Sequence, residues 1–125
     1  MGEIERKYFF DTYAFFEIIK QNLNYSNYLN VGVITTRLNL MELHYRILRE
    51  VGKEEADFHF NRLLPFCVDF TDNEIKEANF FKLKNKKKRL SYVDCLGYIL
   101  ARRRNILFLT GDKEFENFKG VEFVK

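Results

Sequence analysis

Short apolar runs alternate along the chain with longer segments in which apolar residues recur every three or four positions. The short runs predict strands, because each is rich in aromatic or β-branched residues and is bounded by turn-forming residues. They lack the strict polar alternation of a half-exposed sheet, which favours parallel strands covered on both faces. The predicted strands are Lys7–Phe10, Val31–Thr35, Phe66–Phe70, Ile106–Leu109 and Val121–Val124.

The longer segments carry helix periodicity together with start and stop signals. Thr12 is the predicted cap of the first helix, and Thr71 with Glu74 forms a capping-box pattern for a later one. Residues 22–30 contain four Asn and predict a loop. The remaining helices are predicted at 39–50, ended by Gly52, at 53–64, ended by Pro65, and at 91–104. Strands separated by helices predict a three-layer α/β/α domain with a central parallel sheet.

The composition fits one domain over residues 1–125, with no linker, repeat or low-complexity tract. Hydrophobic residues make up 46% of the chain, and 14 Phe with 7 Tyr predict a Phe-rich core. Lys and Arg number 21 against 18 acids, a net charge of +3 that permits a polyanionic partner without requiring one.

We expect a reduced, soluble, cytoplasmic protein. No uncharged apolar run reaches the roughly 18 residues that a membrane span needs. The start, Met1–Arg6, is charged and lacks the apolar stretch of a secretion signal. Cys67 and Cys95 have no metal-type spacing, so we interpret them as small buried apolar residues.

Four acids occupy positions at one edge of the predicted sheet. Asp11 and Asp112 follow strands, and Glu42 and Asp94 fall in the first turns of helices among apolar neighbours. Ligands of open parallel sheets gather at the carboxyl ends of the strands. Clustered carboxylates repel one another unless a cation neutralises them, and hard divalent ions prefer oxygen ligands. Each acid taken alone can instead be a helix or turn cap. Their common placement favours a metal site.

The stretches that carry these acids resemble the four motifs of PIN domains, in order and in spacing, over essentially the whole chain. They are Phe9-Phe10-Asp11-Thr12, Asn39-Leu40-Met41-Glu42-Leu43, Leu90-Ser91-Tyr92-Val93-Asp94-Cys95-Leu96-Gly97-Tyr98 and Leu109-Thr110-Gly111-Asp112. Within PIN domains, the chain is most similar to the small VapC-type ribonuclease toxins of prokaryotes. Cys95 stands where many members carry Ala.

The resemblance implies a ribonuclease that hydrolyses RNA phosphodiester bonds with Mg²⁺ or Mn²⁺. Asp11, Asp94 and Asp112 match its metal ligands, and Glu42 matches a position that acts through water, as a ligand or as a base. Thr12 and Thr110 match positions whose hydroxyls orient the site. The resemblance further implies a homodimer and an antitoxin peptide laid near the acids.

Two alternatives within the family stay open: a nuclease of RNA processing or surveillance, and a non-catalytic PIN-like scaffold. A phosphoacceptor domain of the receiver type fits less well, because it needs paired acids after the first strand and Asp11 stands alone.

The run Lys86-Lys87-Lys88-Arg89, just before the helix that carries Asp94, is a candidate RNA-backbone contact or a solvated face. We interpret the arginines at 102–104 as helix-end cations. The Asn/Tyr segment 22–28 is interpreted as a plain loop, with base stacking as the alternative. His44 and His59 have no partner at ligand spacing, which favours packing or surface roles.

Overall fold

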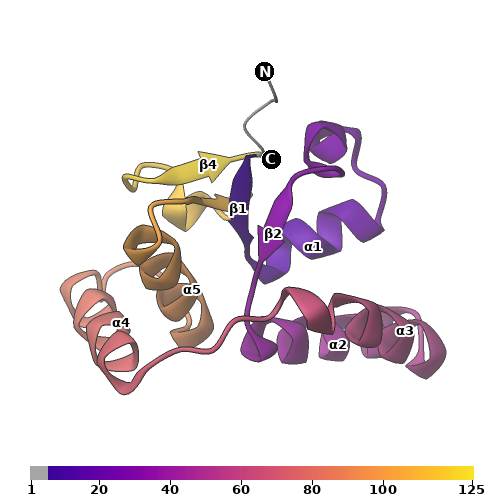
Figure 1. Ribbon diagram of the computed structural model, residues 1–125, viewed down its shortest axis with the longest axis horizontal. Coiled ribbons are helices and arrows are strands. Elements are labelled where there is room, and N and C mark those ends of the chain that lie inside the picture. The colour runs from indigo at the N-terminus through magenta and orange to yellow at the C-terminus, as the bar shows by residue number, and fades with distance from the viewer. Residues whose placement is uncertain (1–5) are drawn as a thin grey trace.

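Four parallel strands form the centre of the molecule in the computed structural model, which describes residues 6–125 (Figure 1). The strands are β1 (Lys7–Phe10), β2 (Gly32–Ile34), β3 (Leu107–Thr110) and β4 (Val121–Phe123), in the order β2-β1-β3-β4. The predicted α/β class with a central parallel sheet is confirmed. The prediction for the charged start of the chain concerns Met1–Arg6, and its first five residues lie outside the described part.

Helices cover both faces of the sheet, so successive residues of the two central strands, 8–10 and 108–110, are buried. Phe10 and Leu109 pack in one cluster with α1 (Thr12–Ile19), α2 (Arg37–Glu50) and α3 (Lys53–Leu63). Phe9 and Phe108 pack in the other with α4 (Asp72–Lys84) and α5 (Tyr92–Arg103). Figure 1 shows the α4–α5 pair and the α2–α3 pair at opposite sides of the molecule. This two-sided burial explains why the strands lack polar alternation.

One predicted strand is wrong. Residues 66–70 contribute only an isolated parallel bridge, in which the Val68 N–H donates to the Thr35 carbonyl oxygen and Thr35 donates to Phe66. Phe66 belongs to the 3-10 helix η2 (Leu64–Phe66), which contains the single proline, and the chain then turns toward α4. The apolar residues of this segment cover the edge of the core: Val68 and Phe70 pack beside it without extending the sheet.

Two local predictions also need correction. The loop at 22–30 contains a second 3-10 helix, η1 (Leu23–Tyr28), capped by the Asn22 side chain. Helix α1 is capped by Asp11 rather than by Thr12, since Asp11 has extended backbone angles and its carboxylate accepts the Ala14 N–H. Thr12 is the first helical residue. A third 3-10 helix, η3 (Lys113–Phe115), follows Asp112.

Cys95 is buried and Cys67 half-buried, and both are free thiols. Burial raises the pKa of the Cys95 thiol to about 11, which keeps it protonated and unreactive. Within residues 6–125, no helix is both long and apolar enough to span a membrane.

Candidate functional site

The first pair of predicted acids lies at the carboxyl ends of two neighbouring strands. Phe10 of β1 pairs with Leu109 of β3, and the Asp11 N–H donates to the Leu109 carbonyl oxygen. This register sets Asp11 beside the end of β3, which Asp112 follows. At Gly111 the backbone lies against the Tyr13 ring and the Val124 carbonyl oxygen, and a Cβ there would overlap both. The sheet itself therefore brings Asp11 and Asp112 to one edge.

The second pair comes from helices on opposite faces of the sheet. Asp94 lies in the first turn of α5, which is seated closely on the strands: a Cβ at Gly97 would lie 2.7 Å from the Phe9 ring. Glu42 lies on α2, which packs against α1. Because α2 begins at Arg37, Glu42 lies beyond the first helical turn in which the sequence placed it. The four carboxylates thus reach the same edge from a strand end, another strand end and two helices.

The charges of two other carboxylates of the site act on Asp11. Asp11 is buried, and burial raises its pKa from 3.8 to about 8, against the lowering effect of hydrogen bonds from Thr110 and the Ala14 N–H. The negative charges of Asp94 and Asp112 raise the pKa of Asp11 further. A buried carboxyl group that feels two other acids is the signature expected of a cation site.

Asp94 links the remaining acid to the cluster. Burial raises its pKa, hydrogen bonds with Ser91 lower it, and the charge of Asp112 raises it again. Burial also raises the pKa of Glu42, a hydrogen bond from Thr12 lowers it, and the charge of Asp94 adds to the rise. Asp94 is therefore the carboxylate whose charge acts on both Asp11 and Glu42.

Hydroxyl groups at the two predicted orienting positions bind the site residues. The Thr12 hydroxyl donates to Oε1 of Glu42 at 2.7 Å, across 30 positions of sequence. The Thr110 hydroxyl oxygen accepts the Asp112 N–H at 3.0 Å and also bonds with Asp11. Asn39, which is fully buried, joins the Thr36 hydroxyl to the Thr12 hydroxyl. The sequence makes Asn39 a candidate start of a capping box with Glu42; that role is wrong, because Thr36 caps α2 and Asn39 lies within the helix.

The capping roles weighed for the aspartates are also real. Asp11 caps α1, Asp94 forms a capping box with Ser91, and Asp112 accepts the Glu114 N–H at 3.0 Å. These bonds turn each carboxylate toward a local amide. Over residues 6–125, no three His, Cys, Asp or Glu side chains converge closely enough to hold a metal ion. The structure therefore brings the acids into one electrostatic cluster without setting them at ligand distances.

The chemistry of the donor set nevertheless fits a hard divalent cation. All the candidate donors are carboxylate oxygens, and the cluster contains neither thiol nor imidazole, which softer metals prefer. Protonation relieves the repulsion among these acids at low pH, and a bound cation relieves it at neutral pH. Asp11, Asp94 and Asp112 are the residues that would hold such an ion.

One cation near the acids was missed from the sequence. Lys82 of α4 donates to the Leu90 carbonyl oxygen, and its charge lowers the pKa of Asp94. Lys82 lies 12 residues before Asp94, and no motif or spacing in the sequence connects the two. Only the packing of α4 on α5 brings the two together.

The other candidate residues from the sequence are either exposed on the surface or held by contacts within the fold. Lys86, Lys87, Lys88 and Arg89 are exposed in the connection from α4 to α5, so they are available to a polyanion. The Lys88 ammonium lies 5.2 Å from the Phe118 ring centroid, and the Arg89 N–H donates to Glu114. Base stacking by the segment 22–28 is not supported, because Tyr25 is fully buried and the Tyr28 hydroxyl donates to Glu122.

The histidines have local partners as well. His44 Nε2 lies 2.7 Å from the Asp57 carboxylate, and His59 Nδ1 accepts from Arg62. Both pairs lie on α2 and α3, and their partners account for these side chains without a metal.

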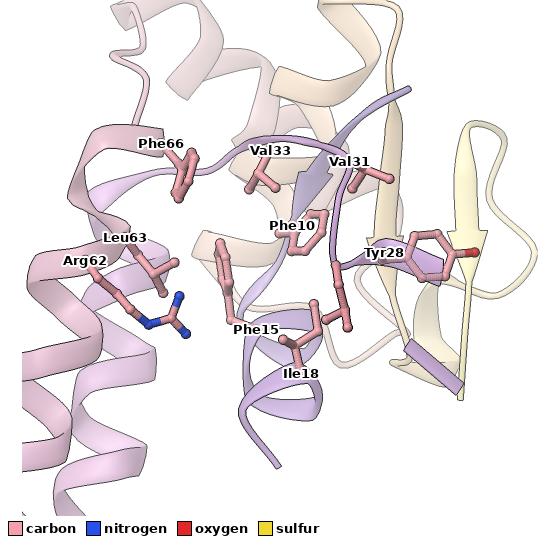
Figure 2. Close-up of a pocket in the computed structure, with 10 residues that line it drawn as sticks. Phe10, Phe15, Ile18, Tyr28, Val31, Val33, Arg62, Leu63 and Phe66 are labelled. Atoms are coloured by element: carbon pink, nitrogen blue, oxygen red, sulfur yellow. The ribbon is translucent and has the colours of Figure 1, made fainter. Parts of the chain in front are cut away.

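A separate apolar pocket of about 170 Å³ opens between β2, α1 and the end of α3 (Figure 2). Figure 2 shows Phe10, Phe15 and Leu63 facing this space, with the Arg62 guanidinium at its side. None of the four site acids lines it. Its chemistry suits an apolar segment rather than a phosphate.

The comparisons with known proteins agree on the fold. The PIN domain family model matches residues 8–121. A search of curated protein sequences gave no significant match.

Solved structures with the same fold include a bacterial toxin and a toxin–antitoxin complex from Klebsiella pneumoniae. VapC20 of Mycobacterium tuberculosis, described as a toxin that cleaves the sarcin–ricin loop, superposes with a TM-score of 0.78 at 18% identity, covering 94% of this chain and 99% of its own. VapBC2 of Rickettsia felis, bound to promoter DNA, gives 0.70 at 20% identity and covers 95% and 99%. DNA-bound VapBC of Salmonella typhimurium gives 0.71 at 18% identity and covers 94% and 96%.

Proposed function

The chain belongs to the PIN domain family, and on that premise we propose that it is a divalent-metal-dependent ribonuclease of the VapC toxin type. One observation carries the proposal: the buried Asp11 carboxyl group feels the charges of Asp94 and Asp112 at the carboxyl edge of the sheet. Such a cluster is costly to the fold, since a neutral residue at position 11 would avoid both the cost of burying a charge and the repulsion from the other acids. A role in cation binding explains why acidic residues occupy these positions.

The proposed roles follow from the contacts of each side chain. Asp11, Asp94 and Asp112 would hold Mg²⁺ or Mn²⁺, which when bound polarises the phosphate and activates water. Glu42 is the candidate general base, because its pKa is raised by burial and the Thr12 hydroxyl fixes its Oε1 atom. Thr110 orients Asp112 through its N–H and Asp11 through its carboxylate. The exposed run Lys86–Arg89 would bind the RNA backbone.

Cleavage of a defined RNA by the purified protein tests this proposal. We expect cleavage with Mn²⁺ or Mg²⁺, none with a chelator, and a loss in Asp112→Asn larger than the roughly 10- to 100-fold cost of removing an outer-shell group. Asp69→Asn is the matched control, because the exposed Asp69 side chain lies outside the acidic cluster. Cleavage by Asp112→Asn at the parent rate would rule out the assigned site, and an inactive parent would favour a non-catalytic scaffold.

We also propose that the partner is an antitoxin protein, and that the chain forms a homodimer. The antitoxin is supported by a toxin–antitoxin complex among the solved neighbours and by the apolar pocket of Figure 2, which offers an amphipathic segment a lining with a single arginine, Arg62. The homodimer rests on the family resemblance. Expression of the parent in a bacterial host should arrest growth, and Asp112→Asn should not. Growth arrest by both would show that RNA cleavage is not the cause.

A further inference from the structure

A shallow hollow lies between α4 and α5, beside the acidic cluster. It has a volume of about 360 Å³, within the range of roughly 300–1,000 Å³ of small-ligand pockets. Its lining combines one aromatic ring with two ammonium groups, and consists of Asn79, Lys82, Leu83, Lys86 and Tyr92. The ribonuclease roles assigned above do not use Lys82 or Tyr92.

Tyr92 presents an unusually open aromatic ring. It is the first residue of α5, two positions before Asp94, and 71% of its surface is exposed. The Ser91 cap fixes the start of the helix, since its hydroxyl accepts the Asp94 N–H at 3.0 Å. The ring and the Asp94 carboxylate are therefore held on the same helical turn.

Lys82 supports this ring from α4. Its ammonium group lies 5.1 Å from the Tyr92 ring centroid, within the range of a cation–π contact. The same group donates to the Leu90 carbonyl oxygen, and its charge lowers the pKa of Asp94. One lysine thus joins the aromatic ring to the acidic cluster.

The charge around the hollow favours a polyanion over an apolar protein segment. Six of the eight residues from 82 to 89 are basic and none is acidic: Lys82, Lys84 and the run Lys86–Arg89. Single-stranded nucleic acid is recognised by this combination, in which cations follow the backbone and bases stack on aromatic side chains.

We infer that Tyr92 is a stacking platform for the base of a nucleotide next to the scissile phosphate, and that Lys86 binds the backbone of that nucleotide. Lys82 is a positioning residue that holds the Tyr92 ring. The inference rests on the proposed ribonuclease function and extends it to the substrate: the RNA enters single-stranded, with one base unstacked from its neighbours. Since every base has a π-face, this contact supplies affinity and register with little sequence preference.

The chain contains no Trp, so Tyr92→Trp introduces a single indole fluorophore at the platform. In the Asp112→Asn background, which keeps the RNA intact, a short single-stranded RNA should quench this fluorescence and bind with an affinity near that of the parent. Tyr92→Phe should also retain affinity, because stacking uses the ring and not the hydroxyl. Tyr92→Ala should weaken RNA binding by about 5- to 100-fold.

Phe80→Ala is the matched control. Phe80 is 63% exposed on α4, with the Lys84 ammonium 5.6 Å from its ring centroid, but it does not line the hollow. We expect its RNA affinity to equal that of the parent. Circular dichroism of all variants reports whether each is folded.

The kinetic form of the test separates this inference from the proposed function. In the otherwise unchanged protein, Tyr92→Ala should raise KM and leave kcat nearly intact. A parent that cleaves RNA, together with Tyr92→Ala that binds and cleaves equally well, would overturn the platform alone. Unchanged RNA binding by Tyr92→Ala with loss of binding to a protein partner would also overturn it, and would assign the hollow to protein docking. An inactive parent would contradict the proposed function, while the fluorescence titration would still decide whether RNA stacks on position 92.

Discussion

Asp11 shows how a single side chain combines a structural and a functional role. Its carboxylate caps α1 through the Ala14 N–H at 2.8 Å, a role that Asn fills equally well. Charge is therefore not needed for the cap. Burial beside Asp94 and Asp112 makes that charge unfavourable, as the raised pKa shows. The acid at position 11 thus costs the fold something that Asn would not.

This cost predicts a pH dependence of stability. The pKa of Asp11 is 3.8 unfolded and about 8 folded, so between these values the native state binds the extra proton. The stabilising contribution of protonated Asp11 is full below about pH 4 and is lost as the pH rises toward 8. In chelator, Asp11→Asn should be more stable than the parent at pH 8, and the difference should shrink toward pH 4.

Urea unfolding of both proteins between pH 4 and 8 measures this difference. Mn²⁺ should restore stability to the parent at pH 8 and have little effect on Asp11→Asn, because only the parent presents the full set of carboxylates. Parallel pH profiles of the two proteins would show that Asp11 titrates in the native state as it does in the unfolded chain.

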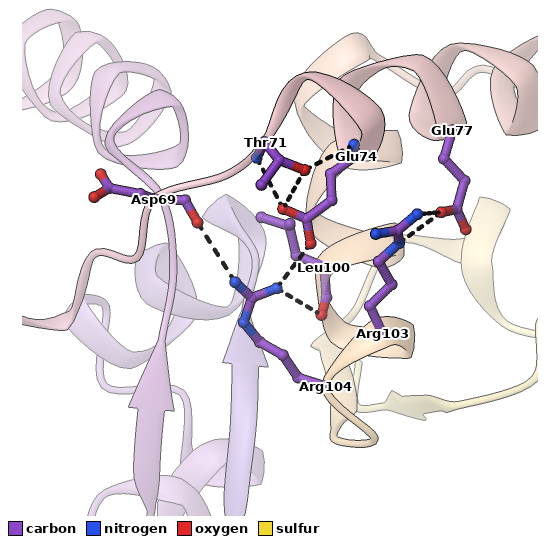
Figure 3. A network of polar contacts seen from close by, with 7 residues as sticks. All are labelled: Asp69, Thr71, Glu74, Glu77, Leu100, Arg103 and Arg104. Atoms are coloured by element: carbon purple, nitrogen blue, oxygen red, sulfur yellow. Dashed lines mark hydrogen bonds and ion pairs between the residues drawn. The ribbon is translucent and has the colours of Figure 1, made fainter.

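A polar network fixes α4 against the end of α5 (Figure 3). Arg104 donates to the Glu74 carboxylate, to the Leu100 carbonyl oxygen and to the Asp69 carbonyl oxygen. Burial works against the charge of Glu74, but the Thr71 N–H and Arg104 outweigh it and lower the pKa of Glu74. The network holds the helix pair that carries Lys82 and Asp94, so it supports the site from a distance.

Arg104→Met and Arg103→Met form a matched pair for this network. Arg104 serves Glu74, whose side chain is 7% exposed, whereas Arg103 pairs with Glu77, which is 41% exposed. Losing the partner of a buried carboxylate costs about 1–3 kcal/mol, and an exposed pair is worth roughly 0–1 kcal/mol. Thermal or urea unfolding at pH 7 should therefore show a larger loss for Arg104→Met. The pKa of Glu74 is lowered in the folded protein, so the extra loss of stability in Arg104→Met should fade as the pH drops below the ordinary pKa of a glutamate. Equal losses at pH 7 would contradict the role of Arg104.

Secondary structure was predictable wherever one local signal decided it. The buried strands at β1 and β3 and the capping boxes of α4 and α5 follow from residues a few positions apart. The strand predicted at 66–70 does not form, because a strand needs a partner strand along its length. Among the described residues, only Thr35 pairs with this segment. The helical turn of η1 was missed because it is held by distant contacts: Tyr25 donates to the Val124 carbonyl oxygen, 99 positions away.

The candidate site divides in the same way. Asp11, Asp94 and Asp112 were predictable because strand ends and first helical turns have known places in a parallel sheet, whereas Glu42 lies beyond the first turn of α2. The bridging of Asn39 between Thr36 and Thr12, and the approach of Lys82 to Asp94, arise only when separate helices pack. No spacing within the sequence encodes either contact.

For the whole molecule, charge is distributed so that RNA binding and chemistry can be tested separately. The exposed run Lys86–Arg89 lies beside the acidic cluster but supplies no ligand for a hard cation. Replacing all four residues with Gln should weaken binding similarly across single-stranded RNA sequences. The negative slope of log affinity against log salt should become shallower by up to about 3, since fewer counterions are released. An unchanged slope would assign the run to a solvated face.

The central claim is that Asp11, Asp94 and Asp112, with Glu42 beside them, form one divalent-cation site, and calorimetric titration with Mn²⁺ tests it without any substrate. At pH 7 Asp11 is largely protonated, so binding to the parent should release protons, seen as a heat that changes with the ionisation enthalpy of the buffer. Asp94→Asn removes the carboxylate whose charge acts on both Asp11 and Glu42, and it should bind Mn²⁺ far more weakly while remaining folded. Binding by Asp94→Asn with the parent's affinity and the parent's proton release would contradict the account.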